Sequence, residues 1–380
     1  MKTITLSANT SWYLYNFRAS TIRALGAAGY RVVCLSPPDA YGPRLAELGG
    51  EWRALPMDNA GRNPLRDLAL LLRLARHYAA LRPVAAFHFT VKNNVYGTLA
   101  ARALGVPAVN NVSGLGTAFI RPGWVARVVR ALYRVSQPLA WRVTCQNAED
   151  LELLRARGLV PASRLALLPG SGVDLQRFRP ALLRPRAPGE PLRLLYAGRM
   201  LADKGLVELV EAVGAVNQVG EPDGPMRCTL DLCGFAGADN VSAISEETLQ
   251  EWGRRPGIRW LGPSDAMHEV YAGADVVVLP SYREGLPRSL LEAGAMGLPA
   301  VATDVPGCRQ VVRDGVNGFL CEARNAGSLR AALERMLALT DEARERMGAA
   351  ARARVEAEFD EQHVVRAALA AVREIEGGRG

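Results

Sequence analysis

The sequence has little of what marks a membrane-spanning, exported or dinucleotide-binding protein. Its most apolar window, Leu68 to Ala75, is interrupted by Arg73 and falls far short of the ~20 residues that span a bilayer. The opening stretch, Met1 to Tyr13, carries one lysine and no apolar core of signal-peptide length, so it indicates a first strand. No Gly-x-Gly-x-x-Gly follows that strand, which argues against an NAD-dependent enzyme.

Cysteines are few and show no paired spacing. The six are Cys34, Cys145, Cys228, Cys233, Cys308 and Cys321. Cys228 and Cys233 share a predicted strand, but their odd separation of five places them on opposite faces, which argues against a shared metal. Scattered cysteines without a predicted export signal are typical of reduced core thiols in a cytosolic protein.

Charge is divided unevenly along the chain. The formal net charge is +8, yet residues 1–180 hold 23 Lys+Arg against 9 Asp+Glu, whereas residues 181–380 hold 23 against 29. The first half is therefore strongly basic and the second half mildly acidic. This balance indicates that the first half faces an anionic partner, for which nucleic acid and an acidic membrane surface are the two candidates.

Short apolar runs alternate with helical patterns throughout, which predicts an α/β fold with doubly wound parallel sheets in two domains. In the first half, strands are expected at Thr3–Ser7, Arg31–Ser36, Val84–Phe89 and Pro107–Asn111. In the second half they are expected at Leu192–Gly198, Cys228–Cys233, Ile258–Leu261, Asp275–Leu279, Pro299–Thr303 and Gly318–Cys321. The clearest helices are expected at Leu65–Leu81, Gly205–Val216, Leu329–Leu337, Ala343–Ala357 and His363–Ile375.

One strand–turn–helix unit carries the strongest chemical signal. The buried run Val276–Leu279 leads through a turn at Glu284-Gly285 into a helix expected to begin at Pro287. The free amides and positive dipole end of that helix would face the carboxyl edge of the sheet, where a diphosphate binds well. Glu284 and Glu292 bracket these amides. The alternative is an ordinary strand–helix connection with two solvated glutamates.

Glu284 and Glu292, with seven residues between them, resemble the paired-glutamate signature of retaining glycosyltransferase family 4, which has the GT-B fold. That family places an arginine and a lysine after the first strand of its second domain, and Gly198-Arg199 and Lys204-Gly205 match those positions. A narrower similarity is to bacterial N-acetylgalactosaminyl- and hexosaminyltransferases that extend polyprenyl-diphosphate-linked glycans. It is carried by His88–Gly97 and Asn110–Phe119.

The resemblance implies two Rossmann-like domains that face a central cleft. Residues 1–170 would form an acceptor-binding domain, onto which a C-terminal helix in residues 361–380 packs back. Residues 171–360 would form the nucleotide-sugar-binding domain. The Pro/Arg-rich run from Ala181 to Pro191, just after the junction, predicts a stiff connector.

The resemblance also implies roles for residues of the second domain. Arg199 and Lys204 would stabilise the departing diphosphate, Glu284 would bind hydroxyls of the donor sugar, and Glu292 would bind the ribose. The remaining donor-binding positions are Gly198, Gly234, Leu261, Gly285 and Leu286, of which Gly234 and Leu261 would read the base, uracil. The chain contains no Asp-x-Asp metal motif, so we expect neither a metal ion nor another cofactor.

The acceptor side is expected in the first domain, at Asn16, Arg18, Lys92, Asn111, Gly114 and Gly116. Two of these assignments have plain alternatives. The loop that contains Asn111, Gly114 and Gly116 would otherwise be a simple Gly/Asn turn, and Lys92 would be a surface lysine. His88 lies near a strand end, but the narrower resemblance aligns the family's histidine with Val91. A packed or solvated His88 is therefore expected.

The stretch Ile120–Val143 interleaves arginines with apolar and aromatic residues. On a helical wheel one stripe contains Trp124, Val125, Val128, Leu132 and Val135, and another contains Arg127, Arg130 and Arg134. Such a helix either lies on an anionic lipid surface or packs its apolar stripe on its own sheet. The lipid-linked acceptor implied by the resemblance favours membrane contact. Nucleic acid is not expected, because no aromatic platform in a basic groove is present.

The sequence therefore predicts a retaining glycosyltransferase that needs no metal. It would move a hexosamine from a UDP-sugar to a polyprenyl-diphosphate-linked glycan during surface polysaccharide assembly, for example of an O-antigen. Its expected location is the cytoplasm, peripheral on the inner face of the plasma membrane. The alternatives are another enzyme of the same fold, such as a UDP-sugar 2-epimerase or a phosphorylase, and a non-catalytic anion-binding protein.

Overall fold

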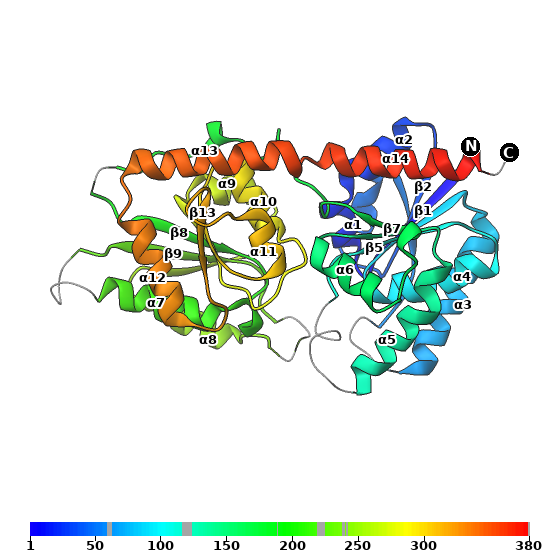
Figure 1. Ribbon diagram of the computed structural model, residues 1–380, viewed down its shortest axis with the longest axis horizontal. Coiled ribbons are helices and arrows are strands. Elements are labelled where there is room, and N and C mark those ends of the chain that lie inside the picture. Colours follow the sequence, from blue (N-terminus) through cyan, green and yellow to red (C-terminus); the bar gives the residue numbers. More distant parts are fainter. Residues whose placement is uncertain are drawn as a thin grey trace. The chain divides into compact units, whose positions relative to one another are not determined.

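A computed structural model of the protein describes residues 1–58, 63–115, 124–187, 189–218, 225–237, 240 and 242–378. The chain divides into two compact units, each with its own parallel sheet (Figure 1). Unit 1 comprises Met1–Ser171 and Glu361–Gly380, and unit 2 comprises Gly172–Asp360.

The sheet of unit 1 has seven strands in the order β3-β2-β1-β4-β5-β6-β7, and all of its neighbouring strands are parallel. The strands are β1 (Thr3–Ser7), β2 (Arg31–Ser36), β3 (Gly50–Ala54), β4 (Ala85–Phe89), β5 (Ala108–Val112), β6 (Arg142–Cys145) and β7 (Leu165–Leu167). The order reverses between β1 and β4, as in doubly wound folds.

Helices cover both faces of this sheet. One face packs against α3 (Pro64–Leu81), α4 (Thr98–Ala103), α5 (Trp124–Ser136) and α6 (Ala148–Ala156). The other face packs against α1 (Ser11–Phe17), α2 (Ala19–Ala27) and α14 (Glu361–Gly377), the last helix of the chain (Figure 1). A π-helical turn, η2 (Asn93–Gly97), precedes α4.

Helix α3 shows how local sequence sets these elements. The Asn63 side chain caps its first turn by accepting from the Leu65 amide, and Pro64 occupies the first helical position. Leu70, Leu74, Tyr78 and Leu81 recur at helical spacing and are all buried. The helix therefore begins and faces the sheet as its sequence dictates.

The sheet of unit 2 has six parallel strands in the order β10-β9-β8-β11-β12-β13. They are β8 (Leu192–Ala197), β9 (Cys228–Cys233), β10 (Ile258–Gly262), β11 (Val276–Leu279), β12 (Ala300–Thr303) and β13 (Gly318–Cys321). The helices of this unit are α7 (Leu206–Asn217), α8 (Glu246–Gly253), α9 (Met267–Ala272), α10 (Arg288–Ala295), α11 (Pro306–Val311), α12 (Ala326–Leu337) and α13 (Asp341–Glu358).

The prediction of two doubly wound parallel sheets is confirmed. The helix start expected at Pro287 was wrong, because α10 begins at Arg288 and Pro287 is its N-cap in extended conformation. Other helix ends differ by one to three residues, and β3, β6 and β7 were not predicted. All six cysteines are buried free thiols, as expected. Burial raises the pKa of the Cys34 thiol to about 12.

In the described part of the chain, no helix combines the length and the apolar character needed to cross a membrane.

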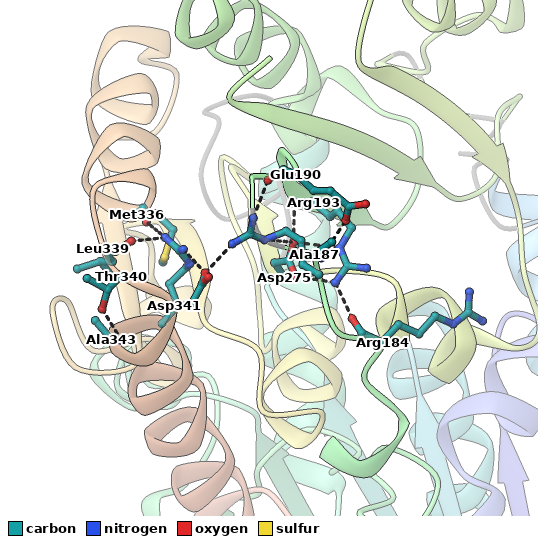
Figure 2. Close-up of polar contacts among 12 residues, drawn as sticks. Arg184, Ala187, Glu190, Arg193, Asp275, Met336, Leu339, Thr340, Asp341 and Ala343 are labelled. Carbon is teal, nitrogen blue, oxygen red and sulfur yellow. Dashed lines mark hydrogen bonds and ion pairs between the residues drawn. The ribbon is translucent and has the colours of Figure 1, made fainter. Parts of the chain in front are cut away.

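The connector into β8 is fixed by charged side chains within unit 2. Asp275 accepts hydrogen bonds from the Arg193 backbone amide at 2.8 Å and from its guanidinium at 3.0 and 2.7 Å. Arg193 in turn donates to the Arg184 carbonyl at 2.7 Å, and Arg186 pairs with Asp341 at 2.6 Å (Figure 2). These contacts tie Arg184, Arg186 and Arg193 to the residue before β11 and to the start of α13.

We expect Asp275→Asn to lower the free energy of unfolding by about 1–3 kcal/mol, because a largely buried carboxylate that accepts hydrogen bonds from Arg193 is lost. Urea denaturation measures the change. The matched control is Asp304→Asn, since Asp304 pairs with Arg309 at an exposed site and should cost less than about 0.5 kcal/mol. Equal losses for the two variants would contradict this account of the connector.

Candidate functional site

The strand order of unit 2 reverses at β8, which pairs with β9 on one side and β11 on the other. The chain segments that follow β8 and β11 therefore leave the same edge of the sheet next to each other. In doubly wound sheets this is the position at which ligands bind. Arg199 and Lys204 follow β8, and Glu284, Gly285 and Leu286 follow β11.

The two segments are in backbone contact. Gly205 has φ +72°, and a Cβ there would lie 2.1 Å from the Pro280 carbonyl oxygen. Only glycine allows both the left-handed conformation and this approach. The Tyr282 amide also donates to the Asp203 carbonyl at 3.0 Å. The turn after β8 and the loop after β11 are thus fixed against each other.

An ion pair joins the two segments. The Nζ atom of Lys204 lies 2.5 Å from Oε1 of Glu284, and the side chains are only 18% and 14% exposed. Arg199 is exposed, and its guanidinium has no hydrogen bond or ion pair with any residue that the structure describes. Burial and the nearby Glu284 charge raise the pKa of the Tyr196 hydroxyl, which donates to the Arg199 carbonyl at 2.8 Å.

Helix α10 directs its N-terminus to the same edge. No side chain among the described residues caps it. Its positive dipole end therefore favours an anion beside Gly285 and Leu286. Glu292 is 9% exposed and its Oε1 accepts from Arg288 Nε at 2.7 Å, one helical turn away. Burial, followed by the Glu292 charge, raises the pKa of Tyr271.

The glycines after β8 and β9 are packed backbone to backbone. A Cβ on Gly234 would lie 1.7 Å from the Gly198 carbonyl oxygen. The indole of Trp260 donates to the Gly234 carbonyl at 3.3 Å. Leu261, on β10, is 45% exposed. The edge therefore presents backbone groups and, among the described residues, the exposed apolar side chains of Phe235 and Leu261.

The predicted acceptor-side residues of unit 1 differ from one another in burial and in their contacts. The Asn16 side chain donates to the Trp12 carbonyl of its own helix, α1, at 3.0 Å. Arg18 is 1% exposed and Asn111 is 3% exposed. Lys92 forms an ion pair with Asp67 at 2.6 Å, so it is not the solvated lysine considered as an alternative. Gly114 has φ +125°, which requires glycine. Gly116 lies outside the described residues.

His88 is a packed histidine, as expected. It is fully buried between the Tyr78 hydroxyl and Asn110 Oδ1, each 2.8 Å from a ring nitrogen. Burial lowers the pKa of His88 to about 4. The ring is therefore neutral at physiological pH and belongs to the core of unit 1. Val91, in contrast, is 40% exposed.

Of the apolar stripe predicted on α5, Leu132 packs against the core of unit 1, whereas three other members do not. Trp124, Val128 and Val135 are 60%, 48% and 61% exposed, and the core side of the helix is instead formed by Ala126 and Tyr133. Arg127 and Arg134 are exposed as well. The alternative that this stripe packs on its own sheet is therefore wrong for these residues. Ile120 and Arg121 lie outside the described residues.

Two family models match the chain. Residues 17–170 match a glycosyl transferase 4-like domain, and residues 184–354 match glycosyl transferases group 1. The chain belongs to this glycosyltransferase family. The recognition made from the paired glutamates and the Arg/Lys positions is thereby confirmed.

Curated relatives of the glycosyltransferase include enzymes named for lipid-linked acceptors. It is 28% identical to the N,N'-diacetylbacillosaminyl-diphospho-undecaprenol alpha-1,3-N-acetylgalactosaminyltransferase of Campylobacter jejuni, over 83% of this chain and 84% of that protein. It is 27% identical to the UDP-Gal:alpha-D-GlcNAc-diphosphoundecaprenol alpha-1,3-galactosyltransferase of Escherichia coli, over 64% of each chain.

Solved structures show that the glycosyltransferase has the GT-B fold. Sucrose-phosphate synthase from Thermosynechococcus elongatus superposes with a TM-score of 0.80 at 20% identity, covering 100% of both chains. Anabaena Alr3699/HepE in complex with UDP and glucose superposes with a TM-score of 0.78 at 17% identity, covering 98% of this chain and 100% of that one. At such identities the likeness concerns the fold alone.

Sequence reasoning missed the partners of the predicted site residues. The Lys204–Glu284 ion pair joins residues 80 positions apart, and no local pattern indicates it. The Arg288–Glu292 pair could have been predicted from the sequence, because an arginine and a glutamate four residues apart on a helix can form an ion pair. The buried, hydrogen-bonded state of Arg18 had no signal in the sequence.

We expect Gly205→Ala to lower the melting temperature at least twice as much as Gly315→Ala. Both glycines have φ near +70°, but a Cβ on Gly315 meets open space. Gly315→Ala should therefore cost only backbone strain, about 1–2 kcal/mol or some 2–8 °C. Differential scanning calorimetry measures both variants. Equal shifts would show that the contact with Pro280 does not constrain the site.

Proposed function

We propose that this glycosyltransferase moves a sugar, a hexosamine, from a UDP-sugar to a polyprenyl-diphosphate-linked glycan, with retention of anomeric configuration. The observation that carries the proposal is the meeting of Lys204, Glu284 and the α10 N-terminus at the β8–β11 edge. The acceptor class is supported by the names of the Campylobacter and Escherichia coli relatives. The donor class is supported by the second relative and by the UDP complex of a structural neighbour.

The chemistry follows from charge. Breaking the sugar–phosphate bond leaves negative charge on the departing diphosphate, which Arg199, Lys204 and the amides of Gly285 and Leu286 would stabilise as it forms. Lys204 is one of only three lysines among 46 basic residues. Its compact ammonium suits a point contact with phosphate, whereas arginine favours a bidentate one.

The two glutamates would hold the donor. Glu284 binds hydroxyls of the transferred sugar and, through its ion pair, positions Lys204 at the leaving group. Glu292 binds the ribose, while Gly234 and Leu261 receive the base and Gly198 lies at the donor as well. In a retaining reaction without a protein nucleophile, the departing phosphate accepts the proton of the attacking hydroxyl on the same face. Neither a metal nor another cofactor takes part.

The acceptor would approach residues of unit 1. Asn16 and Gly114 are the candidates for direct contact, together with Gly116. The buried side chains of Arg18 and Asn111 would position the loop rather than touch the glycan. Lys92 already neutralises Asp67, so it would reach an acceptor diphosphate only by exchanging that partner.

The exposed face of α5 would hold the enzyme at the membrane that contains its lipid-linked acceptor. Trp124, Val128 and Val135 supply apolar surface, while Arg127 and Arg134 supply positive charge, and the helix has no acidic residue. This combination suits an anionic lipid interface. The enzyme would therefore be peripheral on the cytoplasmic face of the membrane, with no role for nucleic acid.

We expect Lys204→Ala to lower kcat at least about 100-fold, because one donor to the developing charge is lost. A UDP-release assay with UDP-GlcNAc, UDP-GalNAc, UDP-Glc and UDP-Gal, with and without a lipid-diphosphate sugar, measures turnover. Lys2→Ala is the matched control. The Lys2 side chain is exposed and pairs with Glu376 of unit 1, so this variant should retain wild-type turnover.

The same assay tests the proposal as a whole. Release should require the acceptor and persist in EDTA. Release without an acceptor would favour a UDP-sugar 2-epimerase, and metal dependence would contradict the proposed role of the cations. Near-normal turnover of Lys204→Ala would remove Lys204 from the site.

We expect Trp124→Glu to weaken binding to phosphatidylglycerol vesicles at least about fivefold, because it places a negative charge on the lipid-facing stripe. Vesicle co-sedimentation measures the change. Val316→Glu is the control, since Val316 is 54% exposed but lies in unit 2. Equal effects of the two variants would show that α5 has no special place in membrane binding.

A further inference from the structure

A cavity of about 130 Å³ lies within unit 1, between α14 and the sheet. Its walls are mostly apolar and come from β4, β5, β7 and α14. The cavity opens to solvent on one side, since Leu167 and Ala370 of its lining are exposed. An engineered apolar cavity of about 150 Å³ binds benzene, so this space accommodates several carbon atoms.

The sequence of α14 explains the cavity. Val372 and Ile375 reach into the core that α14 shares with α2 and the sheet. The cavity-facing positions of the helix are Val364 and four alanines, namely Ala367, Ala368, Ala370 and Ala371. A methyl group does not reach the opposing Phe89 and Leu168 side chains, so the space between them stays unfilled.

Arg18 lines this cavity in an unusual state. Its side chain is 1% exposed, yet no carboxylate among the described residues pairs with it. Its hydrogen bonds go to neutral oxygens: the Tyr13 hydroxyl at 3.0 Å, Asn111 Oδ1 at 3.4 Å and the Gly170 carbonyl at 3.5 Å. The guanidinium also lies 4.1 Å from the Phe89 ring centroid, and its Nε has no partner.

A buried cation without a counter-charge is costly, and an unpartnered buried donor adds to that cost. Both deficits are removed by an anion that binds beside Arg18. The lining contains a second cation, Arg142, whose charge is shared with Glu374 at 3.1 Å, and it contains no carboxylate. The cavity therefore combines hydrocarbon walls with an uncompensated positive charge.

We propose that this cavity binds an anionic amphiphile, a hydrocarbon chain that ends in a phosphate. The headgroup pairs with Arg18 and receives the Nε hydrogen, and the chain fills the space beside the α14 alanines. All lining residues of this site belong to unit 1, and the inference does not depend on sugar transfer. The ligand is either an isoprenoid phosphate or a straight-chain lipid phosphate, since both combine a hydrocarbon chain with a terminal phosphate.

Isothermal titration calorimetry of the full chain with octyl phosphate and geranyl phosphate, below their micelle concentrations, tests the proposal without any donor sugar. We expect saturable binding at one site, with octanol and inorganic phosphate each at least about tenfold weaker. Tighter binding of geranyl phosphate would identify an isoprenoid ligand, and tighter binding of octyl phosphate a straight-chain one. Absence of saturable binding by either would overturn the proposal.

Two variants test separately how the apolar walls of the cavity and the charge of Arg18 contribute to ligand binding. Ala371→Leu fills the cavity with a good helix former, so it should keep or raise the melting temperature and weaken octyl phosphate binding at least about tenfold. Ala349→Leu, at an exposed position of α13, should bind as wild type. Arg18→Met should remove the preference for octyl phosphate over octanol. Unchanged binding by Ala371→Leu would overturn the proposal, whether or not Arg18→Met folds.

Discussion

The close approach of two backbone segments determines the site of unit 2. Neighbouring strands lie about 4.8 Å apart, so the turn after β8 and the loop after β11 leave the sheet side by side. Gly205 lets the first turn touch Pro280 directly. Lys204 directly precedes Gly205, Glu284 follows Pro280 by four residues, and the contact brings the two side chains within ion-pair distance. Arg199 and the α10 N-terminus complete a positive edge suited to a diphosphate.

In unit 1 the notable polar residues are buried in the core or beside the cavity. His88, Asn110 and Tyr78 bond to one another in the core, and burial holds the pKa of His88 at about 4. Arg18 is also buried, but its charge lacks a counter-charge among the described residues. The unit thus has a satisfied polar network on one side of its sheet and an unsatisfied cation beside a cavity on the other. The second condition is the one that calls for a ligand.

Much of this arrangement was predictable from the sequence. Val276–Leu279 is a continuous apolar run, as a strand buried on both faces requires, and the family signature placed the charged residues after β8 and β11. Strands β3, β6 and β7 were missed. β3 carries charged residues at Glu51 and Arg53, β6 begins inside the stretch interpreted as a basic helix, and β7 has only three residues. The start of α10 was misplaced by one residue, because an N-cap and a first helical residue both accommodate proline. The state of Arg18 depends on packing from distant segments, which no local pattern records.

The central claim is that the β8–β11 edge binds the diphosphate of a nucleotide-activated sugar. A crystal structure of the protein with UDP tests it most directly. The account predicts phosphate oxygens within hydrogen-bonding distance of Arg199, Lys204 and the amides at the start of α10, with the ribose at Glu292. A nucleotide bound elsewhere, with these groups unoccupied, would contradict it.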